Sequence, residues 1–336
     1  MNWKNITASL IGVSMLALAA PAFAGDDPGP AAYTQALPGK RVVLVPMAMG
    51  FDLAQGWAAY LKREVEAWGG TFETRDPNWS VEAGAQAITD AIASDPKPNV
   101  LVVHAPDLNS YVKLFKKAQE AGIYVVLIDN PANYAADAFI GSDWNRLGQL
   151  EAEAAVKACS ASSSKQIGLV QGDQVNASSL YQYAGIMKVL EKYPDFKVAA
   201  KPDSNWDATT ARNVTTTMLQ QNPDLCAIID FWDGDASGTA AAIRDAGKEG
   251  KIALVTTGGG EKVDCDKLAS GEFTAVVSTE LHKQSGDMNA IIKFLLQSGQ
   301  PAGTSKTYIY SLEQAYTKAD VKADTCWDVK ALQAAK

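Results

Sequence analysis

The chain has 336 residues, 47% of them hydrophobic, and this length suits two domains of about 150 residues each better than a single core. Its 38 acidic side chains outnumber its 30 basic ones, which gives a formal net charge of -8. Because nucleic-acid-binding proteins concentrate Lys and Arg, this balance excludes a nucleic-acid partner.

Residues 1–24 are organised like a secretory signal peptide. Lys4 supplies the positive charge, Leu10 to Ala20 are apolar, and Ala22-Phe23-Ala24 ends in the small residues of a cleavage site. The apolar stretch is short for a membrane span, and no later segment has a membrane-spanning apolar length. We therefore expect an exported, soluble product that begins near Gly25. Loss of Lys4 leaves 29 basic against 38 acidic side chains, a net charge of -9.

The four cysteines all lie in the second half of the chain, at Cys159, Cys226, Cys265 and Cys326. An even number of cysteines in an oxidising compartment favours disulfides. No Cys-x-x-Cys spacing points to zinc instead. The sequence therefore predicts two disulfides.

A surface leader rich in Pro, Gly and Ala occupies 25–40. From Arg41 onwards, apolar runs of strand length alternate with segments in which apolar residues recur at the spacing of a helix. The first expected set comprises strands at 42–45, 71–75, 100–104, 123–128 and 138–141, with helices at 53–68, 81–93 and 111–121. A long helix at 145–158 precedes a second set, with strands at 167–170, 196–200, 226–229, 252–255 and 274–277 and helices at 179–192, 209–221, 236–246 and 261–270. A helix at 281–297 and a strand at 307–310 follow.

Unbroken apolar strands that alternate with helices are typical of parallel sheets covered on both faces. Because the series of five strands occurs twice, the sequence predicts an α/β protein with two similar, doubly wound parallel-sheet lobes.

The expected carboxyl ends of these strands are strongly polar and aromatic, and ligands of open α/β sheets bind beyond such ends. Asn205-Trp206-Asp207 and Trp232-Asp233 place indoles beside carboxylates at two of them. Sugar C–H faces stack on aromatic rings, and carboxylates accept hydroxyl protons, so this combination suits a polyhydroxylated ligand. For any single one of these residues, a core indole or a helix-capping Asp is the alternative.

Other kinds of site have weaker support. Gly258-Gly-Gly260 could cradle a phosphate, but no Walker lysine follows, so a tight turn is favoured. His104 and His282 lack a partner motif, and Gly-x-Ser-x-Gly and EF-hand spacings are absent. We therefore expect no enzyme activity, no cofactor and no metal site.

Five groups of residues occur in a recognisable order along the mature chain: Val42–Val45 leading to Phe51 and Gly56, Gly122–Asp129, Ile140–Asp143 with Gly148, Asp233–Gly238, and Ala246-Gly247. Together they resemble the periplasmic sugar-binding proteins of the ribose- and galactose-binding family, ABC transporter solute-binding proteins with a lactose-repressor-like core. The resemblance covers essentially the whole mature chain. The signal peptide, the acidic charge and the lack of an N-terminal helix-turn-helix disfavour a repressor role.

The resemblance implies an N-terminal lobe of 38–142 plus 281–312 and a C-terminal lobe of 143–280 plus 313–336, joined by a three-segment hinge. It also implies a periplasmic, monomeric receptor that closes on a neutral sugar or polyol and delivers it to an inner-membrane ABC permease. A chemosensory receptor that signals through a chemoreceptor is the alternative, and a secreted carbohydrate-acting enzyme is a third reading.

Matching positions assign ligand contacts. Phe51 and Trp206 would stack on the sugar, while Asp129 and Asn130 would take ring hydroxyls. The remaining candidates lie at or near strand ends: Asp52, Asp107, Asn205, Asp207, Trp232, Asp233 and Glu280.

Three departures from the family pattern make the expected pocket less charged and more aromatic. Gly258 stands near the position of a usual Asp, Leu180 and Gln182 stand near that of a usual Arg, and Trp232 replaces an Asn.

The implied lobes also suggest the disulfide pairing. Cys159 ends a helix and Cys226 starts a strand, so both should lie on the face of the second lobe away from the cleft. Cys265 and the tail that carries Cys326 should pack on the flank of the same lobe. We expect the pairs Cys159–Cys226 and Cys265–Cys326, since a bridge requires such proximity.

Overall fold

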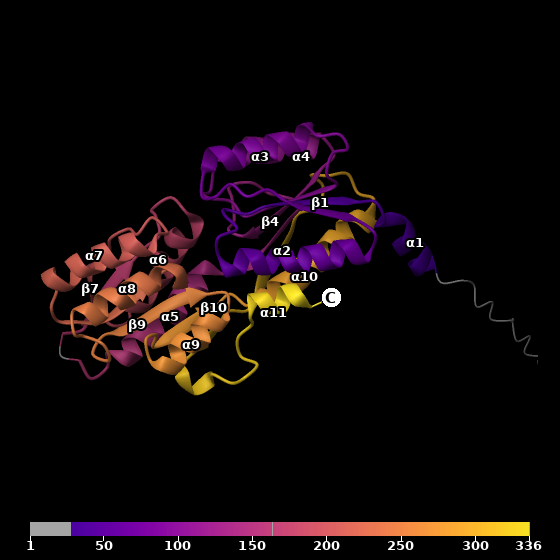
Figure 1. Cartoon of the computed structure of the whole chain (residues 1–336). Coiled ribbons are helices and arrows are strands. Elements are labelled where there is room, and N and C mark those ends of the chain that lie inside the picture. The colour runs from indigo at the N-terminus through magenta and orange to yellow at the C-terminus, as the bar shows by residue number, and fades with distance from the viewer. Residues whose placement is uncertain (1–27, 163, 336) are drawn as a thin grey trace, which may run out of the picture.

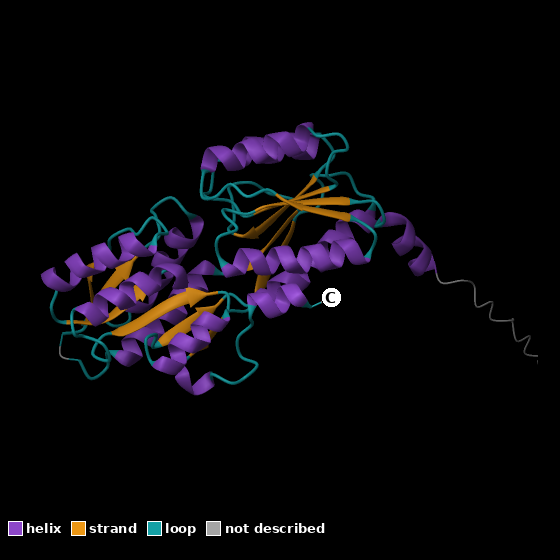
Figure 2. Ribbon diagram, in the orientation of Figure 1, coloured by secondary structure: helices purple, strands orange, loops and turns teal. Residues whose placement is uncertain are grey.

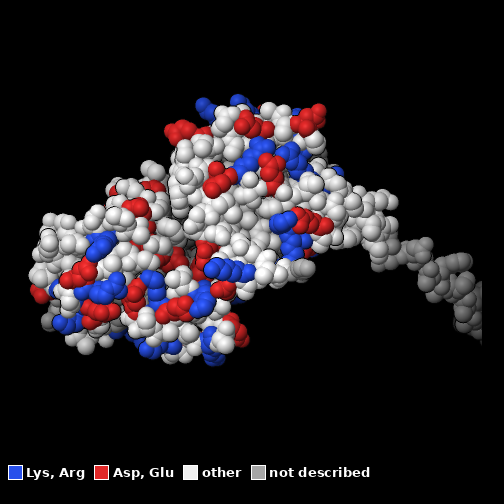
Figure 3. All heavy atoms as spheres, in the orientation of Figure 1, with Lys and Arg blue, Asp and Glu red and all other residues white. Residues whose placement is uncertain are grey.

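A computed structural model describes residues 28–162 and 164–335 and folds them into two α/β lobes (Figure 1). On the face drawn in Figure 3, acidic and basic side chains are interspersed over both lobes. The expected signal peptide lies outside the described residues. Within the described part of the chain, no helix combines the length and apolar character needed to cross a membrane.

The N-terminal lobe is built on a six-stranded, fully parallel sheet with the order β11-β5-β4-β3-β1-β2. Its strands are β1 (Arg41–Val45), β2 (Thr71–Thr74), β3 (Val100–Val103), β4 (Tyr124–Asp129), β5 (Ala138–Ser142) and β11 (Thr307–Ser311). Its helices are α1 (Pro28–Ala36), α2 (Asp52–Ala67), α3 (Val81–Ala93), α4 (Val112–Glu120) and α10 (Leu281–Ser298).

The C-terminal lobe has a six-stranded sheet with the order β12-β10-β9-β8-β6-β7, in which only the edge strand β12 is antiparallel. Its strands are β6 (Gln166–Val170), β7 (Lys197–Ala200), β8 (Leu225–Asp230), β9 (Ala253–Gly258), β10 (Ala275–Ser278) and β12 (Gln314–Tyr316). The remaining elements are α5 (Trp144–Ala158), α6 (Ala177–Leu190), α7 (Ala208–Gln221), α8 (Asp233–Asp245), α9 (Lys262–Ser270), η1 (Lys318–Asp320) and α11 (Val329–Ala334).

Strand alternation supplies apolar side chains to both faces of each sheet, and helices cover both faces (Figure 2). In β1, Val42 and Leu44 join the core under α2 and α10, whereas Val43 and Val45 join the core under α3 and α4. The second lobe has the same arrangement, with one core under α5 and α6 and the other under α7, α8 and α9. This double burial explains the unbroken apolar runs of the sequence.

Three segments join the lobes at the hinge: β5 to α5, β10 to α10, and β11 to β12. Asp143 lies in the first of them, and its Oδ1 accepts hydrogen bonds from the amides of Asn145 and Arg146, both at 3.0 Å, which starts α5. Its own amide donates to Glu313 Oε1 at 2.6 Å, so the first and third segments contact each other.

Both disulfide pairings are confirmed. Cys159 caps the end of α5 and bonds to Cys226 at the start of β8, with a Cα–Cα distance of 5.5 Å. Cys265 on α9 bonds to Cys326 in the tail, with a Cα–Cα distance of 6.1 Å.

Both ends of the described chain differ from expectation. The surface leader contains helix α1, and Leu37 after it is fully buried in the first lobe. At the other end, the tail stays on the second lobe as far as Trp327, whose amide donates to the carbonyl of Gly260 at 3.0 Å and whose carbonyl accepts from the amide of Lys262 at 2.7 Å. The Trp327 indole packs into the core of the first lobe, and α11 adds Val329 and Leu332 to the same core. The tail is therefore a fourth crossing between the lobes, beside the three hinge segments: the Trp327 indole N–H donates to the carbonyl of Gly259 in the second lobe at 2.9 Å, and the apolar side chains that follow it are buried beside α2.

Candidate functional site

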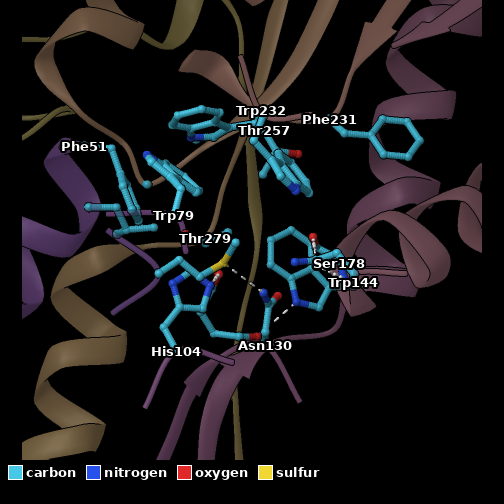
Figure 4. Close-up of a pocket in the computed structure, with 17 residues that line it drawn as sticks. Phe51, Trp79, His104, Asn130, Trp144, Ser178, Phe231, Trp232, Thr257 and Thr279 are labelled. Carbon is cyan, nitrogen blue, oxygen red and sulfur yellow. Dashed lines mark hydrogen bonds and ion pairs between the residues drawn. The ribbon is translucent and has the colours of Figure 1, made fainter. Parts of the chain in front are cut away.

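A cavity lies between the two lobes, where the carboxyl ends of both sheets face each other (Figure 4). Its volume, taken as the space open to the centre of a water molecule, is about 60 Å³. One water needs roughly 10–15 Å³ on this measure, so the cavity can hold a small ligand. Its lining residues are Met47, Phe51, Leu53, Trp79, His104, Asp129, Asn130, Trp144, Asn176, Ser178, Trp206, Phe231, Trp232, Thr257, Gly258, Gly259 and Thr279.

Aromatic rings from both lobes meet across this cavity. In the first lobe, Phe51 and Trp79 stack with their ring centroids 5.6 Å apart. Trp232 of the second lobe lies 5.8 Å from each of these rings and 6.4 Å from Trp206. A hydrogen bond of 2.8 Å from Asn176 Nδ2 to the carbonyl of Pro106 also joins the lobes. The lobes are therefore in contact around the cavity, as expected of a closed state.

Local backbone geometry sets the position of Trp206. Its φ of 58° lies in the left-handed region, which side chains larger than glycine seldom adopt. Its indole Nε1 donates to Asp173 Oδ2 at 2.7 Å. The ring rests against Gly172, where an added Cβ would lie 2.0 Å from an indole carbon. Glycine at this position thus allows the ring to reach the cavity.

Three buried polar atoms of the lining have no hydrogen-bond partner in the described chain: His104 Nδ1, Asn130 Oδ1 and Thr279 Oγ1. Buried polar atoms of folded proteins are nearly always hydrogen-bonded, because leaving one unpaired costs about 1–3 kcal/mol. Water or a ligand in the cavity could therefore supply partners to these three atoms.

His104 and Asp129 form the ionisable pair of the cavity, with Nε2 of His104 lying 3.5 Å from Oδ2 of Asp129. Burial lowers the pKa of His104 to about 3, so its imidazole is neutral at pH 7. Burial raises the pKa of Asp129 to about 7, against a lowering by the hydrogen bond from Gln284. With the His104 proton on Nε2 toward Asp129, Nδ1 becomes a hydrogen-bond acceptor for a ligand hydroxyl.

The cavity brings together five of the predicted ligand-binding residues: Phe51, Asp129, Asn130, Trp206 and Trp232. The other six do not line it: Asp52, Asp107, Asn205, Asp207, Asp233 and Glu280.

Most of these six side chains form hydrogen bonds or cap helices elsewhere in the structure. Asp207 caps α7 by accepting the Thr210 amide at 2.7 Å, and Asp107 accepts the amides of Asn109 and Ser110 at the same distance. Glu280 accepts the Tyr316 hydroxyl at 2.8 Å. Asp52 begins α2, Asn205 is exposed, and Asp233 joins a group of buried carboxyls.

Several lining residues were not among the predicted contacts. Trp79 lies in the loop after β2, with a left-handed φ of 67°. Trp144 donates its indole N–H to the carbonyl of Asp129 at 3.0 Å. His104 has no partner motif in the sequence, and Thr279 directly precedes the predicted Glu280. Each of these four residues follows the end of a strand, and this position is the feature of the sequence that could have identified them as ligand contacts.

The two residues at the family's Arg position lie away from the cavity lining. Leu180 is exposed. Gln182 is buried, and its Nε2 donates to both carboxyl oxygens of Glu151 at 2.9 Å. Burial raises the pKa of Glu151 to about 8, although hydrogen bonds from Gln182 and Thr257 lower it. Among the described residues that line the cavity there is no Lys or Arg.

Comparison with known proteins agrees with this architecture. Residues 42–301 match the model of the periplasmic binding protein domain. The chain is 25% identical to a D-ribose/D-allose-binding protein of Pseudomonas aeruginosa, over 67% of this chain and 72% of the relative. It is 29% identical to the D-allose-binding periplasmic protein of Escherichia coli, over 48% of this chain and about half (54%) of the relative.

One similar solved structure is a solute-binding protein of an ABC transporter from Burkholderia graminis in complex with D-arabinose. It superimposes on this chain with a TM-score of 0.77 at 18% sequence identity, and the match covers 86% of this chain and 99% of that chain. This likeness concerns the fold. The two lobes, the cavity between their strand ends and the match over 42–301 show that the chain belongs to the periplasmic binding protein family.

Proposed function

We propose that this protein is a periplasmic receptor that closes on a small neutral sugar or polyol and delivers it to an inner-membrane ABC permease. The observation that carries the proposal is the set of three unpartnered buried polar atoms, on His104, Asn130 and Thr279, in a cavity walled by aromatic rings. Hydroxyl groups can supply the missing hydrogen bonds while C–H faces of the ligand lie on the rings.

The electrostatics of the lining support a neutral ligand. No cationic side chain among the described residues of the lining would pair with an anion, and Asp129 is its one carboxyl group. The pKa of about 7 at Asp129 means that this group is partly protonated at neutral pH and can donate to a hydroxyl as well as accept from one. The names of the relatives, which bind ribose and allose, point to the same class of ligand.

The pose should differ from that of ribose or galactose in their own receptors. Gly258 offers no carboxylate, and Gln182 is engaged with Glu151. Each missing partner would cost a ribose-like ligand about 1–3 kcal/mol. The small volume and the indole of Trp232 favour a ligand with fewer hydroxyls or with a flat apolar face.

We also propose binding without catalysis. His104 beside Asp129 resembles part of a catalytic set, but no hydroxyl or thiol of the described chain hydrogen-bonds to His104 Nδ1. The hydroxyl of Ser178 is engaged with Asn176 Oδ1 at 2.6 Å. Thr257 of the lining donates its hydroxyl to Glu151 Oε1 at 2.8 Å, but burial raises the pKa of that carboxyl to about 8, so it holds a proton at neutral pH and is a poor base. We therefore infer that none of the described hydroxyls of the lining is an activated nucleophile.

Mass spectrometry of ligand released from the purified protein is the first test, followed by a thermal-shift panel of pentoses, hexoses, tetritols, pentitols and inositols. A ligand raises the melting temperature in proportion to its occupancy, so the tightest member should stand out. Recovery of altered ligand would contradict the non-enzyme assignment. If ribose or galactose binds most tightly, the proposed pose is wrong. Loss of cellular uptake of the identified ligand after gene deletion tests delivery to a permease.

A further inference from the structure

Three carboxyl groups converge directly behind the wall of the ligand cavity. Asp233 lies at the start of α8, Glu261 precedes α9, and Asp264 lies in the first turn of α9. One carboxyl oxygen of each lies within 4.8 Å of the others. Glu261 is 3% and Asp264 is 1% exposed, so two of the three are fully buried.

Within residues 28–162 and 164–335, the positive side chain that acts on this group is Lys267: burial raises the pKa of Asp233, and the charge of Lys267 lowers it. None of the three carboxylates takes part in a salt bridge there. Lys267 lies on the same helix, but its ammonium group pairs with Glu272 and lies over the ring of Phe273. Three carboxyl groups therefore lie close together in a region shielded from water, where ionising all of them at once is unfavourable.

Asp264 is the group that points to a missing ligand. Within the described chain, neither of its buried carboxyl oxygens accepts a hydrogen bond from an N–H or hydroxyl group, and its polar neighbours are the carboxyls of Asp233 and Glu261. In contrast, Glu261 Oε2 accepts the amide of Gly259 at 2.6 Å, and Asp233 Oδ1 accepts the amide of Gly234 at 2.9 Å. Asp264 Oδ2 is directed toward Gly258 and Asp233: a Cβ built on Gly258 would lie 2.4 Å from Asp264 Oδ2 and 3.1 Å from Asp233 Oδ2.

We propose that Asp233, Glu261 and Asp264 form a binding site for a hard divalent cation, Ca²⁺ or Mg²⁺. The donor set consists only of oxygens, which suits these ions and not zinc or copper. Three carboxylates neutralise a double charge with one negative charge to spare. A cation would also supply the partner that both oxygens of Asp264 lack.

The alternative is that the carboxyls hold protons in place of a metal ion. Burial raises the pKa of Glu261 to about 8 and that of Asp233 to about 6, and burial together with the charges of Asp233 and Glu261 raises the pKa of Asp264 well above its usual value. At neutral pH the three carboxyls therefore bind either protons or a cation. Protons are always present, so a cation must compete with them and its binding should weaken as the pH falls.

The test is metal binding by the full mature protein after treatment with EDTA and exchange into metal-free buffer at pH 7.5. Calorimetric titration with CaCl₂ and with MgCl₂ should show one equivalent of at least one of the two ions. At about 100 times the dissociation constant, that ion should raise the melting temperature by about 5 °C. The affinity for that ion should be lower at pH 5.5 than at pH 7.5.

Two variants locate the ion, and a third serves as control. Asp264→Asn and Glu261→Gln should fold, as judged by circular dichroism, and should lose at least 10-fold in cation affinity. Asp266→Asn changes an exposed carboxylate on the same helix that pairs with Lys262, and it should keep the wild-type affinity. The proposal is overturned if the wild type binds neither ion, which would assign protons to the site. It is equally overturned if both variants bind the ion as tightly as the control does.

Discussion

Replacement of Thr279 by Val should raise the stability of the free protein and lower its affinity for ligand. Thr279 is 1% exposed, and its Oγ1 has no hydrogen-bond partner in the described chain. Its backbone amide donates to the carbonyl of Gly258 at 2.9 Å, a bond that Val retains. Because Val has nearly the same shape, the change removes little except the hydroxyl group.

The two expected effects have opposite signs. A buried, unpaired hydroxyl costs about 1–3 kcal/mol, part of which water in the cavity recovers, so the variant should gain about 1 kcal/mol in free energy of unfolding. The complex loses one hydrogen bond with a net value of about 0.5–1.5 kcal/mol, which corresponds to a rise in Kd of about 2- to 12-fold. Denaturant unfolding without ligand and calorimetry with the tightest sugar or polyol measure the two quantities.

Thr239→Val is the matched control. The hydroxyl of Thr239 is also buried, but it donates to Asp230 Oδ2 at 2.6 Å and lies 3.1 Å from the hydroxyl of Thr215. This variant should lose about 1–3 kcal/mol of stability, because Asp230 loses its partner, and its Kd should not change. If Thr279→Val behaves like Thr239→Val, with lower stability and the same affinity, the Thr279 hydroxyl has a structural partner and does not bind the ligand.

Three further outcomes are expected. Trp206→Ala should weaken ligand binding by about 1–3 kcal/mol in calorimetry while the fold survives. An unchanged affinity would make Trp206 a packing residue. Tyr308→Ala, which removes an exposed aromatic side chain, is the control. Glu151 has a pKa of about 8 in the fold against 4.5 ordinarily, so between these pH values the native state holds a proton that the unfolded chain releases. Stability should therefore fall as the pH rises from about 4.5 through 8, and Glu151→Gln should flatten this fall by at least about 1 kcal/mol in unfolding at several pH values. An identical pH profile in the variant would contradict the buried, protonated state. Replacing Cys265 and Cys326 by Ser opens a bridge between residues 61 positions apart, which should cost about 4 kcal/mol of unfolding free energy; a change below about 1 kcal/mol would show that the Trp327 contacts alone hold the tail.

The sequence alone determined the two-lobe α/β architecture and the presence of two disulfides, and the lobes implied by the family resemblance suggested how the cysteines pair. Strands such as β1 are buried on both faces, so their apolar runs are visible without any knowledge of their neighbours. The spacing of apolar residues along a helix is likewise visible within a short stretch of the sequence. The contact of the tail with the first lobe was not visible, because α11 has six residues and its burial depends on the surface of α2, which is distant in the sequence.

Only the tertiary structure decided which strand-end residues face the cavity. Asp and Asn serve as helix caps and as sugar ligands through the same oxygens, so Asp207 and Asn130 look alike in the sequence. One caps α7 and the other lines the cavity. The left-handed backbone at Asp129, Trp206 and Glu280 sets the direction of each side chain. Each of the three residues is hydrogen-bonded to a side chain distant in the sequence, Trp144, Asp173 and Tyr316 respectively, and no local pattern of the chain encodes such partners.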